Sequence, residues 1–222
     1  MSNPLLLALF LLGVFLLVVF YFVSSMFYKR HHETKYHFYQ MFPYEFNYPA
    51  VFKENTYGNA LFILGNIAVM SFYIISPYSS LYKTMSMIIA IVFTMVLICL
   101  ILMPLRYLRT HMTLSVVTMT LSMALPLFNL FLAFDQYQLE TEQIKKVLAI
   151  IAMVVAGLLA LFMMVLILNP KLTFRIYLDK ETDNSGKEVL KRPKVIYLAL
   201  TEWASIFIYF LSPISILLIS LI

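Results

Sequence analysis

Residues 169–194 read NPKLTFRIYLDKETDNSGKEVLKRPK and form the longest polar segment of the 222-residue chain. This segment holds seven of the sixteen Lys and Arg residues and four of the eleven acids. Almost everything else is apolar, so the segment must lie in water. Its basic excess predicts on which side of a membrane it lies.

The composition places the rest of the chain in lipid. Hydrophobic residues make up 62% of the sequence and charged residues only 12%, whereas about a quarter of the residues in a soluble domain are charged. Too little polar surface remains to cover a globule in water. The single cysteine, Cys99, lies in an apolar run, so the sequence has no intramolecular disulfide framework and no cysteine metal cluster.

Six apolar stretches approach or exceed the ~20 residues that a helix needs to cross the hydrocarbon. The predicted fold class is therefore an all-α integral membrane protein, a single bundle of six transmembrane helices with a short cytoplasmic hairpin loop. The expected spans are about residues 4–28, 57–76, 84–103, 113–134, 147–168 and 196–222. The expected cytoplasmic loops are residues 29–56, 104–112 and 169–195.

The loop after the first span is rich in aromatic residues. Residues 36–52 contain eight Phe or Tyr in seventeen positions, and Pro43 and Pro49 argue against one continuous helix. Tyrosine rings favour the headgroup zone of a membrane. We expect a bent segment lying on the membrane surface, with a docking site for a partner as the alternative.

Two spans carry polar residues at helical spacing. The second span has a stripe with a seven-residue interval, formed by Asn59, Asn66 and Tyr73. The fourth has a stripe with steps of three, four, four and three, formed by Ser115, Thr118, Ser122, Pro126 and Asn129. Unpaired amides and hydroxyls are costly in hydrocarbon, so both stripes should face the bundle interior. They line a path for a small polar solute or make ordinary interhelical hydrogen bonds, worth about 0.6 kcal/mol per pair.

Two further patterns describe the second half of the chain. In the fifth span, small residues every four positions allow a neighbouring helix to approach closely: Ala152, Ala156 and Ala160. In the polar segment, alternation over residues 173–178 and a turn signal at 183–186 predict a hairpin whose return limb lies near 187–190.

Glu202 is the one acid placed near hydrocarbon in any span. In one interpretation it lies at the cytoplasmic membrane surface beside an interfacial anchor, Trp203, and its carboxylate reaches Lys194 or water. In the other it is a proton-coupled or substrate-binding carboxylate, because an ionisable group within a span is a candidate functional site.

The distribution of Lys and Arg predicts the orientation. The loops after spans one, three and five contain four, two and seven of these residues, and the loops after spans two and four contain one and two. Thirteen against three puts both termini outside and the aromatic and hairpin loops in the cytoplasm, most simply in a bacterial plasma membrane. Five cations in the last loop are candidates for docking a partner or lipid: Lys171, Arg175, Lys191, Arg192 and Lys194.

Catalytic patterns are weak. His32, Glu33 and His37 resemble the H-E-x-x-H zinc motif, but the second histidine comes one residue late and the two imidazoles would lie on different faces of a helix. Outside this region the only histidine is His111, and the interiors of spans one to five contain no acid. We therefore predict no catalytic residue, no metal site, no cofactor and no enzyme activity.

Two function hypotheses follow. In the first, the chain is an accessory or assembly subunit that engages a membrane or cytoplasmic protein through its cytoplasmic loops. In the second, it is a small transporter or channel that uses the polar faces of spans two and four together with Glu202. The expected partners are the lipid bilayer and such a protein, and no nucleic acid.

Overall fold

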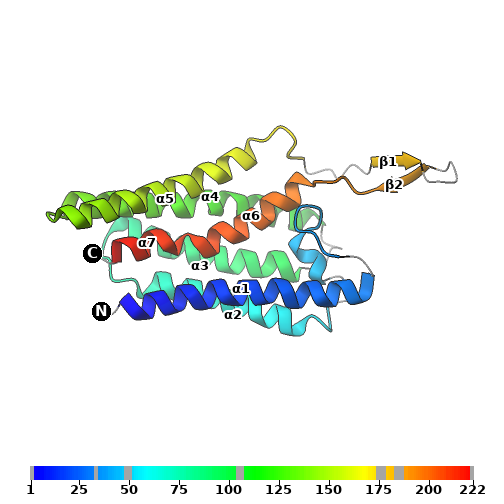
Figure 1. Cartoon of the computed structure of the whole chain (residues 1–222), viewed down its shortest axis with the longest axis horizontal. Coiled ribbons are helices and arrows are strands. Elements are labelled where there is room, and N and C mark those ends of the chain that lie inside the picture. The colour runs from blue at the N-terminus through cyan, green and yellow to red at the C-terminus, as the bar shows by residue number, and fades with distance from the viewer. Residues whose placement is uncertain are drawn as a thin grey trace.

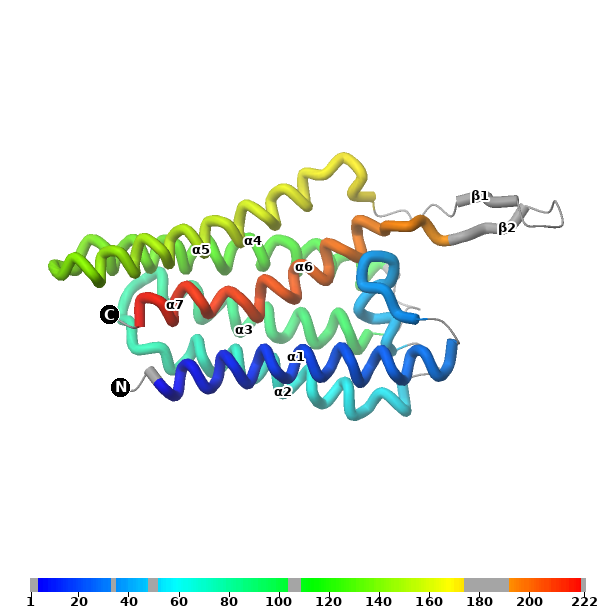
Figure 2. The backbone as a smooth tube through the Cα atoms, viewed as in Figure 1, coloured from blue at the N-terminus to red at the C-terminus, as the bar shows by residue number. Residues whose placement is uncertain are grey.

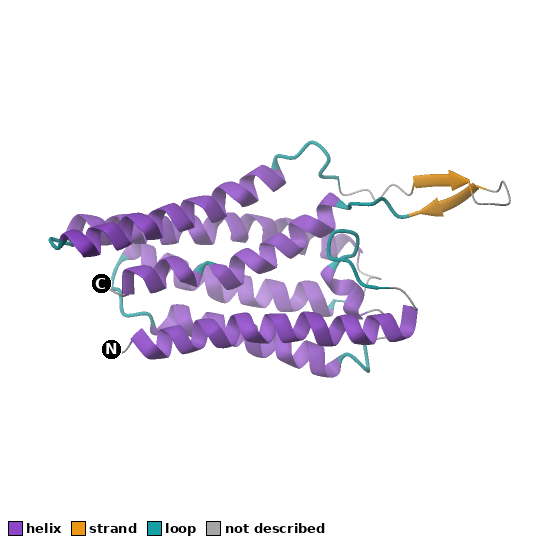
Figure 3. Ribbon diagram, in the orientation of Figure 1, coloured by secondary structure: helices purple, strands orange, loops and turns teal. Residues whose placement is uncertain are grey.

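The computed structural model describes residues 3–32, 35–47, 52–103, 108–173, 179–182 and 188–220. Figures 1 and 2 show a bundle of long helices, and Figure 3 shows a small two-stranded sheet that projects from one end of it. The helices are α1 (Asn3–His32), the short 3-10 helix η1 (Pro43–Asn47), α2 (Thr56–Ile75), α3 (Leu81–Leu102), α4 (Leu108–Leu139), α5 (Gln143–Ile167), α6 (Tyr197–Leu211) and α7 (Pro213–Ser220). The strands are β1 (Asp179–Thr182) and β2 (Glu188–Lys191).

Six helical stretches are long and apolar enough to cross a membrane, which fits a membrane-embedded protein. They are Pro4–His32, Thr56–Ile75, Leu81–Leu102, Arg109–Leu139, Gln143–Ile167 and Tyr197–Ser220. The prediction of six such helices is confirmed. The first and fourth are longer than predicted, because helical hydrogen bonding continues past the apolar residues into polar ones such as Lys29 and Asp135. Helix α4 also continues through Pro126.

Local sequence features mark where helices begin. Helix α3 starts after Ser80, whose hydroxyl accepts a hydrogen bond of 3.2 Å from the amide of Lys83, as an N-cap serine does. Just before α5, the carboxylate of Glu140 accepts hydrogen bonds from the amides of Thr141 and Glu142, at 2.9 and 3.2 Å. Each bond satisfies an amide that the helical ladder would leave free.

The last span, formed by α6 and α7, lies at the centre of the bundle. In its apolar window 72% of the residues are buried, against 22% in α1 and in α5. It packs against all five of the other spans. Pro213 begins α7 because its ring has no amide hydrogen to continue the ladder, yet Ser212 keeps helical backbone angles, φ −54° and ψ −31°. The last span is therefore one slightly interrupted helix.

The two ends of the bundle differ. Both termini lie at one end in Figure 1, and the sheet projects from the other, which we call the hairpin end. The strands are antiparallel, with Asp179 opposite Lys191 and Thr182 opposite Glu188. Strand β2 overlaps the predicted return limb. The predicted first limb, residues 173–178, and the turn, residues 183–186, fall almost entirely outside the described residues.

Residues 35–47, which we call the cap, fold back against the hairpin end of the bundle. All five residues of η1 are buried. Phe46 is fully buried and stacks on Tyr36, with ring centres 4.0 Å apart. The segment is bent, as the prolines predicted, and it packs against the bundle. Its expected place on a membrane surface stays a prediction.

Helix α5 packs against α4, α6 and α7 through small residues. The three alanines predicted to allow close approach are all buried: Ala152, Ala156 and Ala160. Gly157 lies beside them, and a Cβ there would meet Leu130 of α4 at 3.4 Å, an ordinary contact.

Candidate functional site

A carboxylate, an imidazole and a hydroxyl meet between α4 and α6 near the hairpin end. Ser115 Oγ donates a hydrogen bond of 2.6 Å to Glu202 Oε1, and His111 Nε2 lies 3.5 Å from the same oxygen. His111 and Ser115 are four residues apart, so α4 presents both to the same side of α6. We call these three residues the His–Ser–Glu cluster.

The cluster is sealed from solvent. Glu202 is 0% exposed, Ser115 1% and His111 4%. Among the described residues, Glu202 Oε2 and both ring nitrogens of His111 have no hydrogen-bond partner. Removing a charged group from water costs several kcal/mol unless it is paired. An acidic and a basic side chain therefore lie against each other where solvent does not reach.

The cap covers the cluster and is fastened to the base of the hairpin. The ring of Tyr44 lies edge-on to that of His111, with centres 4.1 Å apart. The next residue, Glu45, is buried and accepts a hydrogen bond of 3.0 Å from the amide of Phe42. Arg192, the first residue after β2, places Nη1 2.9 Å from both oxygens of Glu45. The hairpin is thus tied to the residue next to the aromatic ring that covers His111.

Trp203 is held by the cap. Its Nε1 donates to Tyr36 Oη at 3.0 Å and to the Met41 carbonyl at 3.2 Å. Burial raises the pKa of Tyr36 well above its ordinary value; the hydrogen bond from Trp203 lowers it, and the nearby charges of Glu45 and Glu202 raise it further. The Tyr36 hydroxyl therefore stays protonated and can donate to the cap carbonyl of Phe42, 2.7 Å away.

This arrangement corrects the expected interfacial anchor. Trp203 is fully buried, so its indole bonds to the cap instead of standing among lipid headgroups. Glu202 is also buried, and its contacts are Ser115 and His111, while Lys194 is exposed.

Polar side chains continue from the cluster along the interface of α4 with α6 and α7. We call this row the polar seam; it consists of Thr118, Ser122, Asn129, Ser205 and Ser212, all buried. Ser122 Oγ lies 3.2 Å from Ser205 Oγ, and Asn129 Nδ2 donates to the Ser212 carbonyl at 3.0 Å. From His111 to Asn129 the helix rises about 27 Å, close to the thickness of the hydrocarbon core. The His–Ser–Glu cluster and the polar seam together therefore extend over most of the thickness of a hydrocarbon core.

The polar stripe of α2 takes a different position from that in the solute-path hypothesis. Helix α2 packs against α1, α3 and α7, whereas α4 packs against α3, α5, α6 and α7. Asn59 bonds to Asn47 of the cap, and the amide of Asn66 donates to a carbonyl of its own helix at 2.8 Å. The two stripes meet where Asn129 Nδ2 donates to Tyr73 Oη at 3.0 Å. The stripe of α4 faces the last span because that span occupies the centre of the bundle.

The five candidate docking cations are placed differently from one another. Arg192 bonds to Glu45, and Lys171 lies with Nζ 5.8 Å from the ring centre of Tyr197. Lys194 is exposed. Arg175 lies outside the described residues, and Lys191 is described only as part of β2. Their role in docking stays a prediction.

The histidines near the end of α1 have structural neighbours. His31 Nε2 lies 3.0 Å from Glu54 Oε2, and the ring of His32 stacks on Tyr28 with centres 4.2 Å apart. Glu33 lies outside the described residues. Within the described ranges, no three His, Cys, Asp or Glu side chains gather in a way that could hold a metal ion.

His111 is the site residue that the sequence stripe did not include. It precedes Ser115 by four positions and therefore continues the stripe by one further step toward the hairpin end. The predicted span began at residue 113, which left His111 in a loop. Extending the stripe past the apolar boundary would have found it.

The chain matches no protein-family model, and it matches no curated protein and no solved structure.

Proposed function

We propose that this chain is a non-enzymatic membrane transporter for a small polar solute, coupled to protons through the His–Ser–Glu cluster. One observation carries the proposal. Glu202 is fully buried beside His111, and its second oxygen has no partner among the described residues. Ionisable groups are expensive inside a membrane, and where they occur they mark proton relays and substrate sites.

The chemistry of the pair suggests how coupling works. Holding one proton, His111 and Glu202 are neutral together; gaining or losing a proton leaves a net charge in a low-dielectric interior. A net charge favours admission of water or a polar solute, and the cap residue Tyr44 packs directly against His111. Protonation would thereby be linked to movement of the cap.

The polar seam would supply the hydrogen bonds for the solute. In the structure its hydroxyls also lie near backbone carbonyls of their own helices, with Ser122 Oγ 2.8 Å from the Met119 carbonyl and Ser205 Oγ 2.9 Å from that of Thr201. Such bonds satisfy Ser122 and Ser205 while no solute is present, whereas Thr118 Oγ1 and Asn129 Oδ1 have no hydrogen-bond partner among the described residues. These bonds suit a closed conformation in which a solute later replaces them.

The orientation in this proposal follows from the basic loops. We propose that both termini lie outside a bacterial plasma membrane, and that the cap and hairpin lie in the cytoplasm. The excess of Lys and Arg in residues 29–56, 104–112 and 169–195 supports it. The His–Ser–Glu cluster would then take its protons from the cytoplasmic side.

Reconstitution in liposomes tests the transport proposal. With a pH gradient imposed, internal pH is followed while amino acids, sugars, nucleosides and small organic cations are added in turn. We expect one class to move protons, and Glu202→Gln to reduce this movement by at least about tenfold, a loss typical of a proton-transfer group. Glu54→Gln, an exposed acid near the hairpin end, is the matched control and should retain activity. Equal flux through both variants would end the proposal.

A second function is favoured by the hairpin. The sheet has two strands in the described part of the chain, so each strand has one unpaired edge. Such a sheet is marginally stable alone, and an unpaired edge can pair with a strand from another protein. As the alternative, we propose an accessory or assembly subunit that engages a membrane or cytoplasmic partner through this hairpin.

Affinity purification in mild detergent, with quantitative mass spectrometry, tests the alternative. The structure defines the variant: residues 179–191 are replaced by a neutral linker and Arg192 is kept, because it holds Glu45. A stoichiometric partner that is lost from this variant would favour the accessory function. Retention of every associated protein by the variant would count against it.

A further inference from the structure

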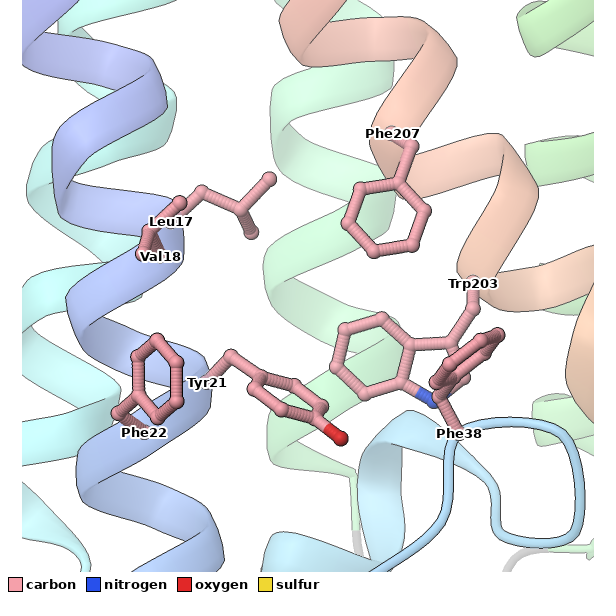
Figure 4. A pocket seen from close by; sticks show the side chains of 7 residues that line it. All are labelled: Leu17, Val18, Tyr21, Phe22, Phe38, Trp203 and Phe207. Atoms are coloured by element: carbon pink, nitrogen blue, oxygen red, sulfur yellow. The ribbon is translucent and has the colours of Figure 1, made fainter.

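An apolar groove opens between α1 and α6, separate from the His–Ser–Glu cluster (Figure 4). Its volume is about 240 Å³, and seven residues line it: Leu17, Val18, Tyr21, Phe22, Phe38, Trp203 and Phe207. Five of the seven are aromatic, and they come from three parts of the chain. Figure 4 shows side chains from α1 on one side of the groove, from α6 on the other, and Phe38 of the cap at one end.

The groove has a buried floor and exposed walls. Leu17 and Trp203 are 4% and 0% exposed, whereas Phe22, Phe38 and Phe207 are 67%, 39% and 39% exposed. Both α1 and α6 belong to spans long and apolar enough to cross a membrane, so the opening faces the place where lipid chains would lie. An apolar, elongated occupant fits such a lining, and a polar solute does not.

Basic residues follow the groove toward the hairpin end. Lys29 lies seven positions after Phe22, which is nearly two turns further along the same face of α1, or about 10 Å. Lys35 stands three positions before Phe38 at the start of the cap. Both lysines are exposed. The apolar lining thus leads toward positive charge, the order in which an anionic lipid presents its acyl chain and headgroup.

We infer that the α1–α6 groove is a binding site for an anionic phospholipid. One acyl chain lies between the exposed rings of Phe22 and Phe207, over the buried Trp203, and the phosphate-containing headgroup lies near Lys29 and Lys35. This site is independent of the proposed transport function and of the hairpin.

The single tryptophan of the chain makes the site directly observable. Trp203 lines the groove and is the only Trp in the sequence, so intrinsic Trp fluorescence reports on this position alone. Purified full-length protein in detergent is titrated with phosphatidylglycerol carrying bromine atoms on its acyl chains, which quench a nearby indole. The same titration uses brominated phosphatidylcholine. We expect saturable quenching, with half-saturation by phosphatidylglycerol at about tenfold lower concentration, since each well-placed cation strengthens anionic lipid binding several-fold.

Two variants with matched controls separate the chain site from the headgroup site. Val18→Phe fills the groove and should raise the half-saturating concentration of both lipids several-fold, whereas Val154→Phe on the exposed face of α5 should not. Lys29→Gln should reduce the preference for phosphatidylglycerol and leave phosphatidylcholine unchanged. Lys83→Gln, at the end of the bundle that carries the termini, is its control.

Several outcomes would overturn the inference. Quenching that grows linearly and equally for both lipids means ordinary solvation by lipid. An unchanged titration of Val18→Phe places the lipid elsewhere. A co-purifying protein whose removal is needed before any quenching occurs means that the groove is a protein interface.

Discussion

The cap contacts two polar clusters, one at each end of η1, and their hydrogen bonding differs. At Asn47 the partners are neutral amides: Asn47 Nδ2 donates to Asn59 Oδ1 at 2.9 Å, and Asn59 Nδ2 donates back to Asn47 Oδ1 at 2.8 Å. Asn55 joins them and accepts a hydrogen bond of 2.9 Å from Ser24 of α1. We call these four residues the Asn network.

At Tyr44 and Glu45 the neighbouring cluster contains an acid and a base. Among the described residues, three polar atoms of His111 and Glu202 have no hydrogen-bond partner, whereas no side-chain atom of the Asn network is in that position. Amides can satisfy one another in full and therefore hold helices together. An ionisable pair with free capacity is costly to keep, which is why we assign function to one cluster and stability to the other.

The largest effect on stability is expected when the Asn network is broken. A Cβ at Gly58 would overlap Asn55 Oδ1 and Ser24 Oγ, so Gly58→Ala forces apart the bond that joins α1 to the start of α2. Overpacking and the loss of a buried hydrogen bond together should lower the free energy of unfolding by about 3 kcal/mol. Thermal unfolding in detergent measures this loss of stability.

Gly157→Ala is the control for this substitution. Its Cβ meets Leu130 at an ordinary 3.4 Å, and alanine favours a helix over glycine by about 1 kcal/mol. The variant should be as stable as the native protein or more so. Similar losses for Gly58→Ala and Gly157→Ala would contradict the close contact at the Asn network.

A smaller effect is expected where the cap is fastened between the two clusters. Arg192→Ala leaves the buried carboxylate of Glu45 without its guanidinium partner. Losing one partner of a fully buried pair costs 3–5 kcal/mol, and because the Arg192 side chain is 40% exposed we expect about 2 kcal/mol. Unfolding and protease cleavage near residues 35–47 report the change. Lys194→Ala should leave both unaltered, and an equal response from the two variants would argue against the fastening.

A still smaller effect, of opposite sign, is expected at the His–Ser–Glu cluster. Glu202→Gln keeps an oxygen that can accept from Ser115 and removes a buried ionisable group. Unfolding stability should stay unchanged or rise by about 1 kcal/mol, while the proton-linked activity proposed above is lost. A loss of stability as large as that of Gly58→Ala would mean that Glu202 serves the same structural purpose as the Asn network.

The smallest effect is expected at an exposed acid near the other end of the bundle. Hydrogen bonds from the amides of Glu142 and Thr141 lower the pKa of Glu140 below its ordinary value. The stabilisation is therefore present above the ordinary pKa and disappears as the pH falls through the lowered pKa. Unfolding of native protein and Glu140→Gln over an acidic pH series should converge at low pH. A difference in stability between the two proteins that widens as the pH falls would contradict this prediction.

The sequence predicted the number of apolar helices because runs such as the one ending before Lys29 are long and uninterrupted. It also predicted that Ser115, Ser122 and Asn129 face the interior, since helical spacing depends only on local geometry. Helix neighbours are a tertiary property, and the hydropathy pattern of α4 contains nothing that selects α6 over α2. That choice depends on the central position of the last span.

The cap and Glu202 were harder to predict for a related reason. An aromatic residue such as Phe46 or Trp203 suits both a membrane surface and a protein interior. The sequence alone therefore does not show that both side chains are buried inside the protein. Glu202 stands five residues after the first residue of α6, where a helix starting at the membrane surface would leave it wet. The cap covers that position and excludes solvent from it.

The central position of α6 and α7 also matters while the protein is being made. Chains emerge from the ribosome at about 5–20 residues per second, N-terminal part first. Ser115 and Glu202 are separated by 87 positions, so α4 waits on the order of ten seconds for its partner. During that interval the polar face of α4 lacks the hydrogen-bond partners that the last span supplies.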